Sequence, residues 1–431
     1  FARGDLIKLM SSLTAMFRSV FLSLPFLGAF RHLHQSSAIM EKLRMDFLGP
    51  LDRRDKRILW FSDTVSDLNG VSFTINNFVE QAVKKGLNVR LVAARSERNR
   101  QSPFLLSLPT AYEYTPEFYS NYTMRFPSLL KALEIIYEQR PTEILISTPG
   151  PVGLLGILAA RLFGVPCRGI YHSDFTRMTE LGLSGGTMAS FVQGYIRWFY
   201  SHLDEIRVPT QEIMKLLVLR DYEASHMKLF QRGINTILFA PVPGDREDLR
   251  ASYGLDGAMT LVYVGRVSRD KSLGFLVEVY RELFARGEEV NLLIVGEGPM
   301  LAELKKTMAS FPRVRFTGRL KRDDLPLIYS FSDLFVFPST MDTFGMAVLE
   351  AQACGLPALV TDVGGPQEVI IKEETGFVIP AGDLSSWSGA ILDVKGIMQK
   401  DPETYERMRS KARERALKGF GWEQALSDLF T

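Results

Sequence analysis

The sequence predicts an α/β protein made of two doubly wound, Rossmann-like domains that face a cleft. Three observations lead to this fold class. At 431 residues, the chain is too long for one ordinary hydrophobic core. Short apolar segments alternate with longer segments of helical period from Lys56 onward, which is typical of parallel βα units. The same alternation starts again near Met259, after a proline-containing linker at 235–248.

The first series predicts a parallel sheet and its crossover helices. Strands are expected at 57–62, 87–94, 143–148, 167–174 and 204–210, and helices at 73–86, 128–140 and 153–164. In open α/β sheets, ligands bind at the turns that follow the strands, so the polar and glycine-containing turns are the places to search for a site.

The second series repeats the pattern. The expected strands include 260–267, 290–298, 314–318, 334–339, 357–365 and 376–382, and the expected helices include 273–287 and 299–311 with Pro299 in the first turn. The predicted divisions are an extension at 1–55, domains at 56–240 and 241–415, and a C-terminal helix at 416–431 that crosses back.

The composition is that of a globular enzyme, with 46% hydrophobic and 23% charged residues. A net charge of +2 offers no strong field for collecting phosphates, so a nucleic-acid partner is not expected. Cys167 and Cys354 lie far apart in apolar surroundings, which predicts neither a disulfide nor a zinc site and favours the reducing cytoplasm.

Residues 1–50 allow two interpretations. The apolar run at 20–30 is interrupted by Pro25 and is shorter than the ~20 residues a spanning helix needs. An apolar, net basic stretch can lie peripherally on an anionic membrane surface, here the inner face of the membrane. The alternative is a helical extension packed on the domain or leading to an upstream domain.

Two cations mark the first strand-to-helix turn of the second series. Arg266 and Lys271 follow the strand at 260–267, where a planar guanidinium and a compact ammonium can hold a diphosphate. A solvated basic turn is the alternative, since Arg269 and Asp270 alternate in charge beside them.

Gly296 and Gly298 follow the next strand and would let the backbone approach a flat ligand such as a nucleotide base. The dinucleotide-binding pattern would require glycine at 301, where Leu301 stands, so a nicotinamide dehydrogenase is disfavoured. A turn that needs glycine for local reasons is the alternative.

The most informative stretch is STMDTFGMAVLEAQACG at 339–355. If a helix starts near Thr343, its amino end presents the amides of Phe344, Gly345 and Met346 to an anion or a sugar oxygen. Glu350 then lies about two turns inside the helix and flanks a ligand whose other end meets Asp342. The alternative is that Glu350 pairs with a cation and Asp342 caps the helix.

Two positions stand out in the first series. Gly70 precedes a helix and leaves room for a phosphate or an acceptor at the helix end. His172 lies at the end of the strand at 167–174, where a polar role near a reacting centre is favoured over a backbone-bonded structural role.

Taken together, these motifs resemble the retaining glycosyltransferases of family 4, which have the GT-B fold. The resemblance covers about Arg57 to the C-terminus and includes VGRVSRDK, VGEGPM, RGINTILF and the 339–355 stretch with its following GLP and GGPQE segments. SDTVSDLNGVS, STPGPVGLLG and YHSDF resemble the branch that transfers mannosyl, glucosyl or sulfoquinovosyl groups to lipids. DKS and DLNG depart from the usual family pattern.

The resemblance implies the roles of the candidate residues. The catalytic set is His172 near the transferred sugar, Arg266 and Lys271 on the diphosphate, and Asp342 on the sugar hydroxyls. Glu350 would hold the ribose, and the further donor-side residues are Gly70, Gly265, Gly296, Gly298, Thr343, Phe344, Gly345, Met346 and Leu349. Asn69 and Asp174 are placed on the acceptor side, and no metal or other cofactor is expected.

The predicted function is transfer of a hexose from a UDP- or GDP-sugar to a lipid or glycan acceptor, with retention of the anomeric configuration. Two alternatives stay open: a sugar-nucleotide epimerase of the same fold, and a non-catalytic nucleotide-sugar-binding protein.

Overall fold

The computed structural model describes residues 56–65, 70–95, 103–115, 123–177 and 186–430, with scattered positions between 14 and 49. Most of the expected extension at 1–55, and Asn69, lie outside the described residues. Among the helices that are described, none is long and apolar enough to cross a membrane.

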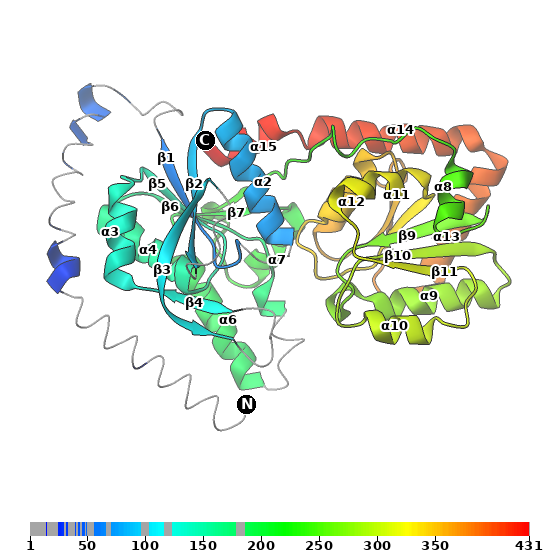
Figure 1. The fold of residues 1–431 in the computed structure, drawn as a ribbon, viewed down its shortest axis with the longest axis horizontal. Coiled ribbons are helices and arrows are strands. Elements are labelled where there is room, and N and C mark those ends of the chain that lie inside the picture. The colour runs from blue at the N-terminus through cyan, green and yellow to red at the C-terminus, as the bar shows by residue number, and fades with distance from the viewer. Residues whose placement is uncertain are drawn as a thin grey trace. The chain divides into compact units, whose positions relative to one another are not determined.

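The chain forms two compact units (Figure 1). The first comprises Phe1–His172, Gly182–Arg207 and Tyr222–Lys228, and the second comprises Ser173–Leu181, Val208–Asp221 and Leu229–Thr431. The division interleaves segments of the chain, and each unit is organised around its own sheet.

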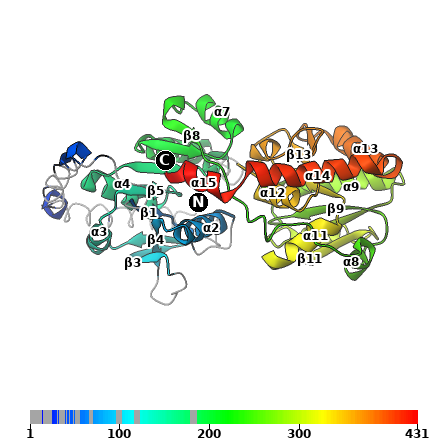
Figure 2. The ribbon, with the colours of Figure 1, turned by 90° about the horizontal axis from the view of Figure 1, so that it is seen from above.

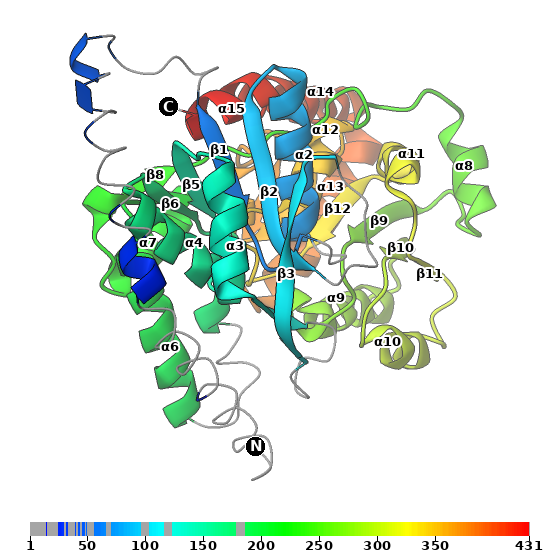
Figure 3. The ribbon, with the colours of Figure 1, turned by 60° about the vertical axis from the view of Figure 1, so that its left-hand side comes forward.

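The first sheet has eight strands in the order β4-β3-β2-β1-β5-β6-β7-β8. They are β1 (Arg57–Phe61), β2 (Asn88–Arg95), β3 (Leu105–Tyr114), β4 (Met124–Pro127), β5 (Glu143–Ile146), β6 (Cys167–Ile170), β7 (Glu205–Val208) and β8 (Met227–Leu229). Figure 3 looks onto β1, β2 and β3, which run alongside one another in parallel. The central position of β1 places its carboxyl end beside that of β5, so residues far apart in sequence meet there.

Helices join these strands. They are α2 (Gly70–Lys84), α3 (Leu129–Glu138), α4 (Pro151–Phe163), α6 (Gly186–Ser201) and α7 (Gln211–Leu219), followed by the short 3-10 turn η3 (Ala224–His226). The sequence predicted the first three of these helices but not α6 and α7. Helix α4 begins with a proline and ends at Gly164, whose left-handed conformation (φ 62°) is one that glycine adopts without strain.

The second sheet has six strands in the order β11-β10-β9-β12-β13-β14, and all of its pairs are parallel. They are β9 (Met259–Val264), β10 (Val290–Val295), β11 (Val314–Gly318), β12 (Leu334–Phe337), β13 (Ala358–Thr361) and β14 (Gly376–Ile379). Every residue of β9, β10, β12 and β13 is buried, as expected for a parallel sheet covered on both faces.

Helices cover both faces of this sheet (Figure 1). They are α8 (Arg246–Ser252), α9 (Leu273–Ala285), α10 (Leu301–Thr307), α11 (Leu325–Phe331), α12 (Met346–Ala353), α13 (Leu384–Lys400) and α14 (Pro402–Gly419). The last described helix of the chain is α15 (Trp422–Phe430). The 3-10 turns are η4 (Arg269–Lys271), η5 (Arg322–Asp324) and η6 (Gly365–Glu368). Helix α14 packs on α12 and runs along this unit, as the view from above shows (Figure 2).

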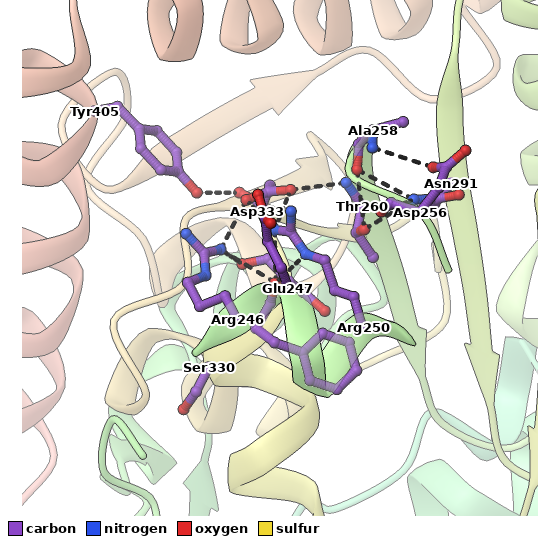
Figure 4. Close-up of polar contacts among 12 residues, drawn as sticks. Arg246, Glu247, Arg250, Asp256, Ala258, Thr260, Asn291, Ser330, Asp333 and Tyr405 are labelled. Carbon is purple, nitrogen blue, oxygen red and sulfur yellow. Dashed lines mark hydrogen bonds and ion pairs between the residues drawn. The ribbon is translucent and has the colours of Figure 1, made fainter. Parts of the chain in front are cut away.

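A buried carboxylate joins four elements of the second unit (Figure 4). Asp333, just before β12, accepts hydrogen bonds from Arg246 and Arg250 of α8 at 2.7 Å and from the backbone N–H of Thr260 in β9 at 2.8 Å. The hydroxyl of Tyr405 in α14 donates to the backbone oxygen of Asp333 at 2.8 Å. These bonds fix α8 and α14 against the edge where β9 and β12 begin.

The alternating pattern missed strands β3, β4 and β8 of the first sheet. Strands β3 and β4 form an antiparallel pair at its edge, where the sequence predicted only parallel βα units. β4 follows β3 without a crossover helix in the described residues, so the helix-based rule had no signal for it.

Several helix starts also differ from prediction. Helix α2 begins at Gly70 itself, α10 begins at Leu301 after Pro299, and α12 begins at Met346 instead of near Thr343. Gly345 explains the last difference, because its φ of 91° lies outside the right-handed helical region.

Candidate active site

The turn after β9 carries a lysine held by two carboxylates. Lys271, in η4, lies 2.8 Å from Asp342 and 3.4 Å from Asp270, measured from Nζ to the nearer carboxylate oxygen. Strands β9 and β12 are neighbours in the sheet, which brings the turns that follow them together. The sequence predicted both Lys271 and Asp342 for the site, and the fold makes them direct partners.

The charge of Lys271 is stabilised where it lies. Burial alone would lower the pKa of the ammonium group, but Asp342 and Asp270 outweigh it and raise the pKa above its ordinary value. Lys271 is therefore a fixed positive charge at neutral pH. Arg266, in the same turn, is exposed, and its backbone oxygen accepts a hydrogen bond from the buried Tyr263 hydroxyl at 2.8 Å.

Gly345 marks the amino end of α12. Its left-handed conformation favours glycine, and a Cβ there would lie 3.0 Å from the ring of Pro366. Among the described residues, no side chain caps this end of α12, and Asp342 pairs with Lys271, so the capping role considered for Asp342 does not apply. The free N–H groups and the positive end of the helix dipole favour an anion or a sugar oxygen at this point.

Glu350 already has partners within the second unit. Arg322 of η5 donates to one carboxylate oxygen at 2.5 Å, and the Tyr329 hydroxyl donates to the other at 3.3 Å. Burial raises the pKa of Glu350, and the charge of Arg322 opposes that shift. The alternative in which Glu350 pairs with a cation therefore describes this structure. Arg322 also lies 4.7 Å from the centroid of the Phe239 ring, which fixes its orientation.

The glycine turns after β9 and β10 pack on each other. A Cβ at Gly296 would lie 1.9 Å from the oxygen of Gly265, and one at Gly298 would lie 2.2 Å from the oxygen of Val267. The N–H of Val267 also donates to the oxygen of Glu297 at 2.9 Å. The backbones of the two turns approach so closely that Gly296 and Gly298 must be glycine. This agrees with the alternative in which the turn needs glycine for local reasons.

A hydrogen-bonded chain of three side chains lies at the carboxyl edge of the first sheet. The Trp60 indole N–H in β1 donates to Ser147 Oγ after β5 at 2.6 Å, and Ser147 Oγ lies 2.9 Å from Nε2 of His172 after β6. Strands β1, β5 and β6 are adjacent, which is why these residues meet. His172 is buried, as are its two neighbours in the chain of bonds.

Asp63 lies at the same edge and was not predicted as a site residue. Its carboxylate accepts hydrogen bonds from the Thr148 hydroxyl at 2.6 Å and from the N–H of Val152, in the first turn of α4, at 2.8 Å. A Cβ at Gly150 would lie 2.5 Å from this carboxylate, so glycine is needed there. Burial raises the pKa of Asp63 to about 6, against the opposing effect of these hydrogen bonds.

The remaining predicted residues have diverse surroundings. Asp174, in the second unit, accepts a hydrogen bond from Arg220 at 2.7 Å. Leu349 is fully buried and packs in the core of this unit. Thr343 and Phe344 are buried and Met346 is half-buried.

Sequence reasoning missed the partners of the predicted residues. Tyr329 and Arg322 come from α11 and η5, and Ser147 lies in the STPGP segment that had been noted only as a motif. In the described part of the chain, no group of three or more His, Cys, Asp or Glu side chains could hold a metal ion. Both cysteines are free and buried, as the sequence predicted.

Two family profiles match nearly consecutive parts of the sequence. "Glycosyltransferase Family 4" matches residues 68–238, and "Glycosyl transferases group 1" matches residues 245–415. The chain belongs to glycosyltransferase family 4. This confirms the resemblance found in the sequence motifs.

Curated relatives of this family 4 chain carry glycosyltransferase names. The sulfoquinovosyl transferase SQD2 of Arabidopsis thaliana is 28% identical over 67% of this chain and 56% of its own length. A GDP-mannose-dependent α-mannosyltransferase of Mycobacterium tuberculosis is 30% identical over 57% of this chain and 61% of its own. The α-monoglucosyldiacylglycerol synthase of Streptococcus pneumoniae is 26% identical over 70% of both. The matches thus span a little over half to about two thirds of the relatives' lengths.

Solved structures confirm the GT-B fold of this family 4 member. Sucrose-phosphate synthase from Thermosynechococcus elongatus has a TM-score of 0.69 and 22% identity over 87% of this chain and 97% of its own. Anabaena HepE, solved with UDP-glucose, has a TM-score of 0.67 and 16% identity over 86% of this chain and 98% of its own.

Proposed function

We propose that this family 4 chain is a retaining hexosyltransferase that uses a UDP- or GDP-sugar as donor and a lipid or glycan as acceptor. One observation carries the proposal: Lys271, held charged by Asp342 and Asp270, lies in the turn beside the one that leads to the uncapped amino end of α12. Two sources of positive potential on neighbouring turns suit the diphosphate of a nucleotide sugar.

In the proposed mechanism, Lys271, Arg266 and the amides at Gly345 stabilise the charge that develops on the leaving diphosphate. This electrostatic role needs no nucleophile from the protein. The chain of bonds from Trp60 through Ser147 holds the His172 ring in one orientation, as a polar group directed to the transferred sugar would require.

The acceptor is inferred from chemistry and from the relatives' names. Two of the relatives described above are named for sulfoquinovosyl transfer and for synthesis of a glucosyldiacylglycerol. Residues 1–50, apolar and net basic, are proposed to hold the protein peripherally on the inner face of an anionic membrane. No metal is proposed to take part.

Replacing Lys271 tests this function. We expect Lys271→Ala to lower kcat/KM for transfer from the donor sugar by about 100-fold or more, the usual effect of removing one group that stabilises transition-state charge. Lys395→Ala is a matched control. Lys395, on helix α13, has the same side-chain exposure of 19% as Lys271, and its Nζ lies 2.7 Å from a carboxylate oxygen of Glu288.

The assay measures release of nucleoside diphosphate with and without acceptor, and NMR gives the anomeric configuration of the product. A rate for Lys271→Ala within twofold of that of Lys395→Ala would contradict the site. Inversion of configuration would contradict the retaining mechanism, and sugar interconversion without acceptor would indicate the epimerase.

A further inference from the structure

Arg232 is a buried cation that lies close to two aromatic rings. The residue follows β8 in the segment QRGINT and is only 4% exposed. Its guanidinium carbon lies 5.8 Å from the centroid of the Phe230 ring and 5.9 Å from that of Phe344. The two rings stabilise part of the positive charge by cation–π attraction. They do not accept hydrogen bonds from the five N–H groups, which point outward in the plane of the guanidinium.

Within the described residues, no carboxylate or hydrogen-bond acceptor is paired with this guanidinium. Nε is buried without a hydrogen-bond partner, and burial lowers the pKa of Arg232 to about 10. Other arginines of the same unit differ, among them the buried Arg250 and the half-buried Arg415. Arg250 bonds to Asp333, and Arg415 donates to the backbone oxygens of Glu368 and Val369.

An unpaired buried charge is costly to a fold, and perturbed buried groups cluster at functional sites. Phe344, against which Arg232 lies, immediately precedes Gly345 and the uncapped amino end of α12. The ring that Arg232 faces therefore belongs to the residue directly before the amino end of α12, in the same unit. The cation and the helix end both favour a negatively charged group, and each has donors to offer it.

We propose that Arg232 binds an oxyanion of the donor at the amino end of α12. The inference rests on the proposed function, because it takes a nucleotide sugar as the ligand. The oxyanion comes from the diphosphate or from an acidic sugar that carries a carboxylate or a sulfonate. A planar guanidinium suits all three groups, since each offers two or more oxygens for paired hydrogen bonds.

The test uses the full chain with Arg232→Met. Methionine fills the space beside the two rings with an apolar side chain and removes the charge. Because Arg232 has no described hydrogen-bond or ion-pair partner to lose, and because methionine replaces its ring contacts with apolar ones, the melting temperature without ligand should stay equal to or above that of the wild type. Affinity for inorganic pyrophosphate or the donor should fall by about 10- to 100-fold, as for a lost hydrogen bond to a charged group.

Arg415→Met is the matched control. Arg415 also lies over a ring, with its guanidinium carbon 5.0 Å from the Phe420 centroid, but its donors bond to backbone oxygens. This variant should melt at a lower temperature and keep the same affinities. Calorimetry and melting curves are recorded with pyrophosphate, UDP, UDP-glucose and UDP-glucuronate, and the same series is run with GDP and GDP-mannose.

The ligands separate the two sources of the oxyanion. Weaker binding of pyrophosphate, UDP and UDP-glucose to Arg232→Met identifies the diphosphate, and weaker binding of UDP-glucuronate alone identifies the acidic sugar. Either result supports the proposal.

Wild-type affinities in Arg232→Met for every ligand would overturn it, as would a loss of melting temperature like that of Arg415→Met without an effect on binding. If the wild type binds pyrophosphate through Arg232 but none of the nucleotides, the anion site stands and the proposed function fails. If the wild type binds nothing, both fail.

Discussion

At the scale of single residues, Asp63 gives stability that depends on pH. Its pKa is about 6 in the folded chain and 3.8 as an ordinary value, so the folded state binds more protons between these values. The contribution of Asp63 to the free energy of unfolding is then present in full below pH 3.8, and it is lost as the pH rises through 6. At 1.36 kcal/mol per pKa unit, the loss amounts to about 3 kcal/mol at pH 7.

We expect Asp63→Asn to remove this dependence. An amide can still accept from the Val152 N–H and donate to the Thr148 oxygen, so its geometry is retained. The free energy of unfolding, measured by urea titration with tryptophan fluorescence from pH 4 to 7, should increasingly favour the variant as the pH rises. Parallel curves for the two proteins would show that Asp63 has no raised pKa.

Asp383→Asn is the control of opposite sign. Asp383 caps α13 by accepting from the Ser386 N–H at 3.0 Å, and this bond lowers the pKa of Asp383. Its contribution is present above pH 3.8 and is lost as the pH falls through the lowered pKa. This variant should therefore lose stability relative to the wild type near neutral pH, and the deficit should disappear in acid.

At the scale of secondary-structure elements, Asp333 holds helix α8 and strands β9 and β12 together (Figure 4). Asp333→Asn would leave Arg246 and Arg250 without their carboxylate, with the Arg250 side chain only 9% exposed. Breaking such a buried pair costs about 3–5 kcal/mol. The urea unfolding transition of the second unit should move by that amount.

Asp256→Asn is the control for this prediction. Asp256 pairs with Arg313 at 2.7 Å, and their side chains are 48% and 31% exposed, so the change should cost below about 1 kcal/mol. Equal effects from the two substitutions would mean that Asp333 does not organise these elements.

The sequence predicted regular elements well because their periods are local. Strands β9, β10, β12 and β13 appear as continuous apolar runs since both faces are covered, and each glycine turn follows such a strand. The contacts of Asp333 reach back to Thr260 and Arg246 across long stretches of chain, and no local pattern encodes them.

The candidate site likewise contains residues that local sequence patterns predict and partners that only the fold brings together. Lys271, Asp342 and Gly345 were found because turns at one sheet edge are predictable from the strands that precede them. Arg322 as the partner of Glu350 was not, because η5 approaches α12 only in the folded unit. For Gly296 the sequence left open a ligand role and a local one, and the contact with the oxygen of Gly265, which a Cβ would meet, is visible only in the fold.

At the scale of the whole molecule, the candidate residues are divided between the two units. Lys271, Asp342 and Glu350 belong to the second unit, and the chain of bonds ending at His172 belongs to the first. A donor held by the second set should stabilise that unit, because a ligand bound only to the folded form shifts its unfolding equilibrium.

Hydrogen exchange with and without the nucleoside diphosphate checks this expectation. At a ligand concentration of about 100 Kd, the added stability is about 2.7 kcal/mol, so core amides that exchange by unfolding of their unit should slow about 100-fold. We expect this slowing in β9, β10 and α12, and little change in β1, β2 and β5, because the sheets are separate folding cores. Lys271→Ala should abolish the slowing at the same ligand concentration. Equal slowing in both sheets would mean that the first unit shares the donor contacts or unfolds together with the second.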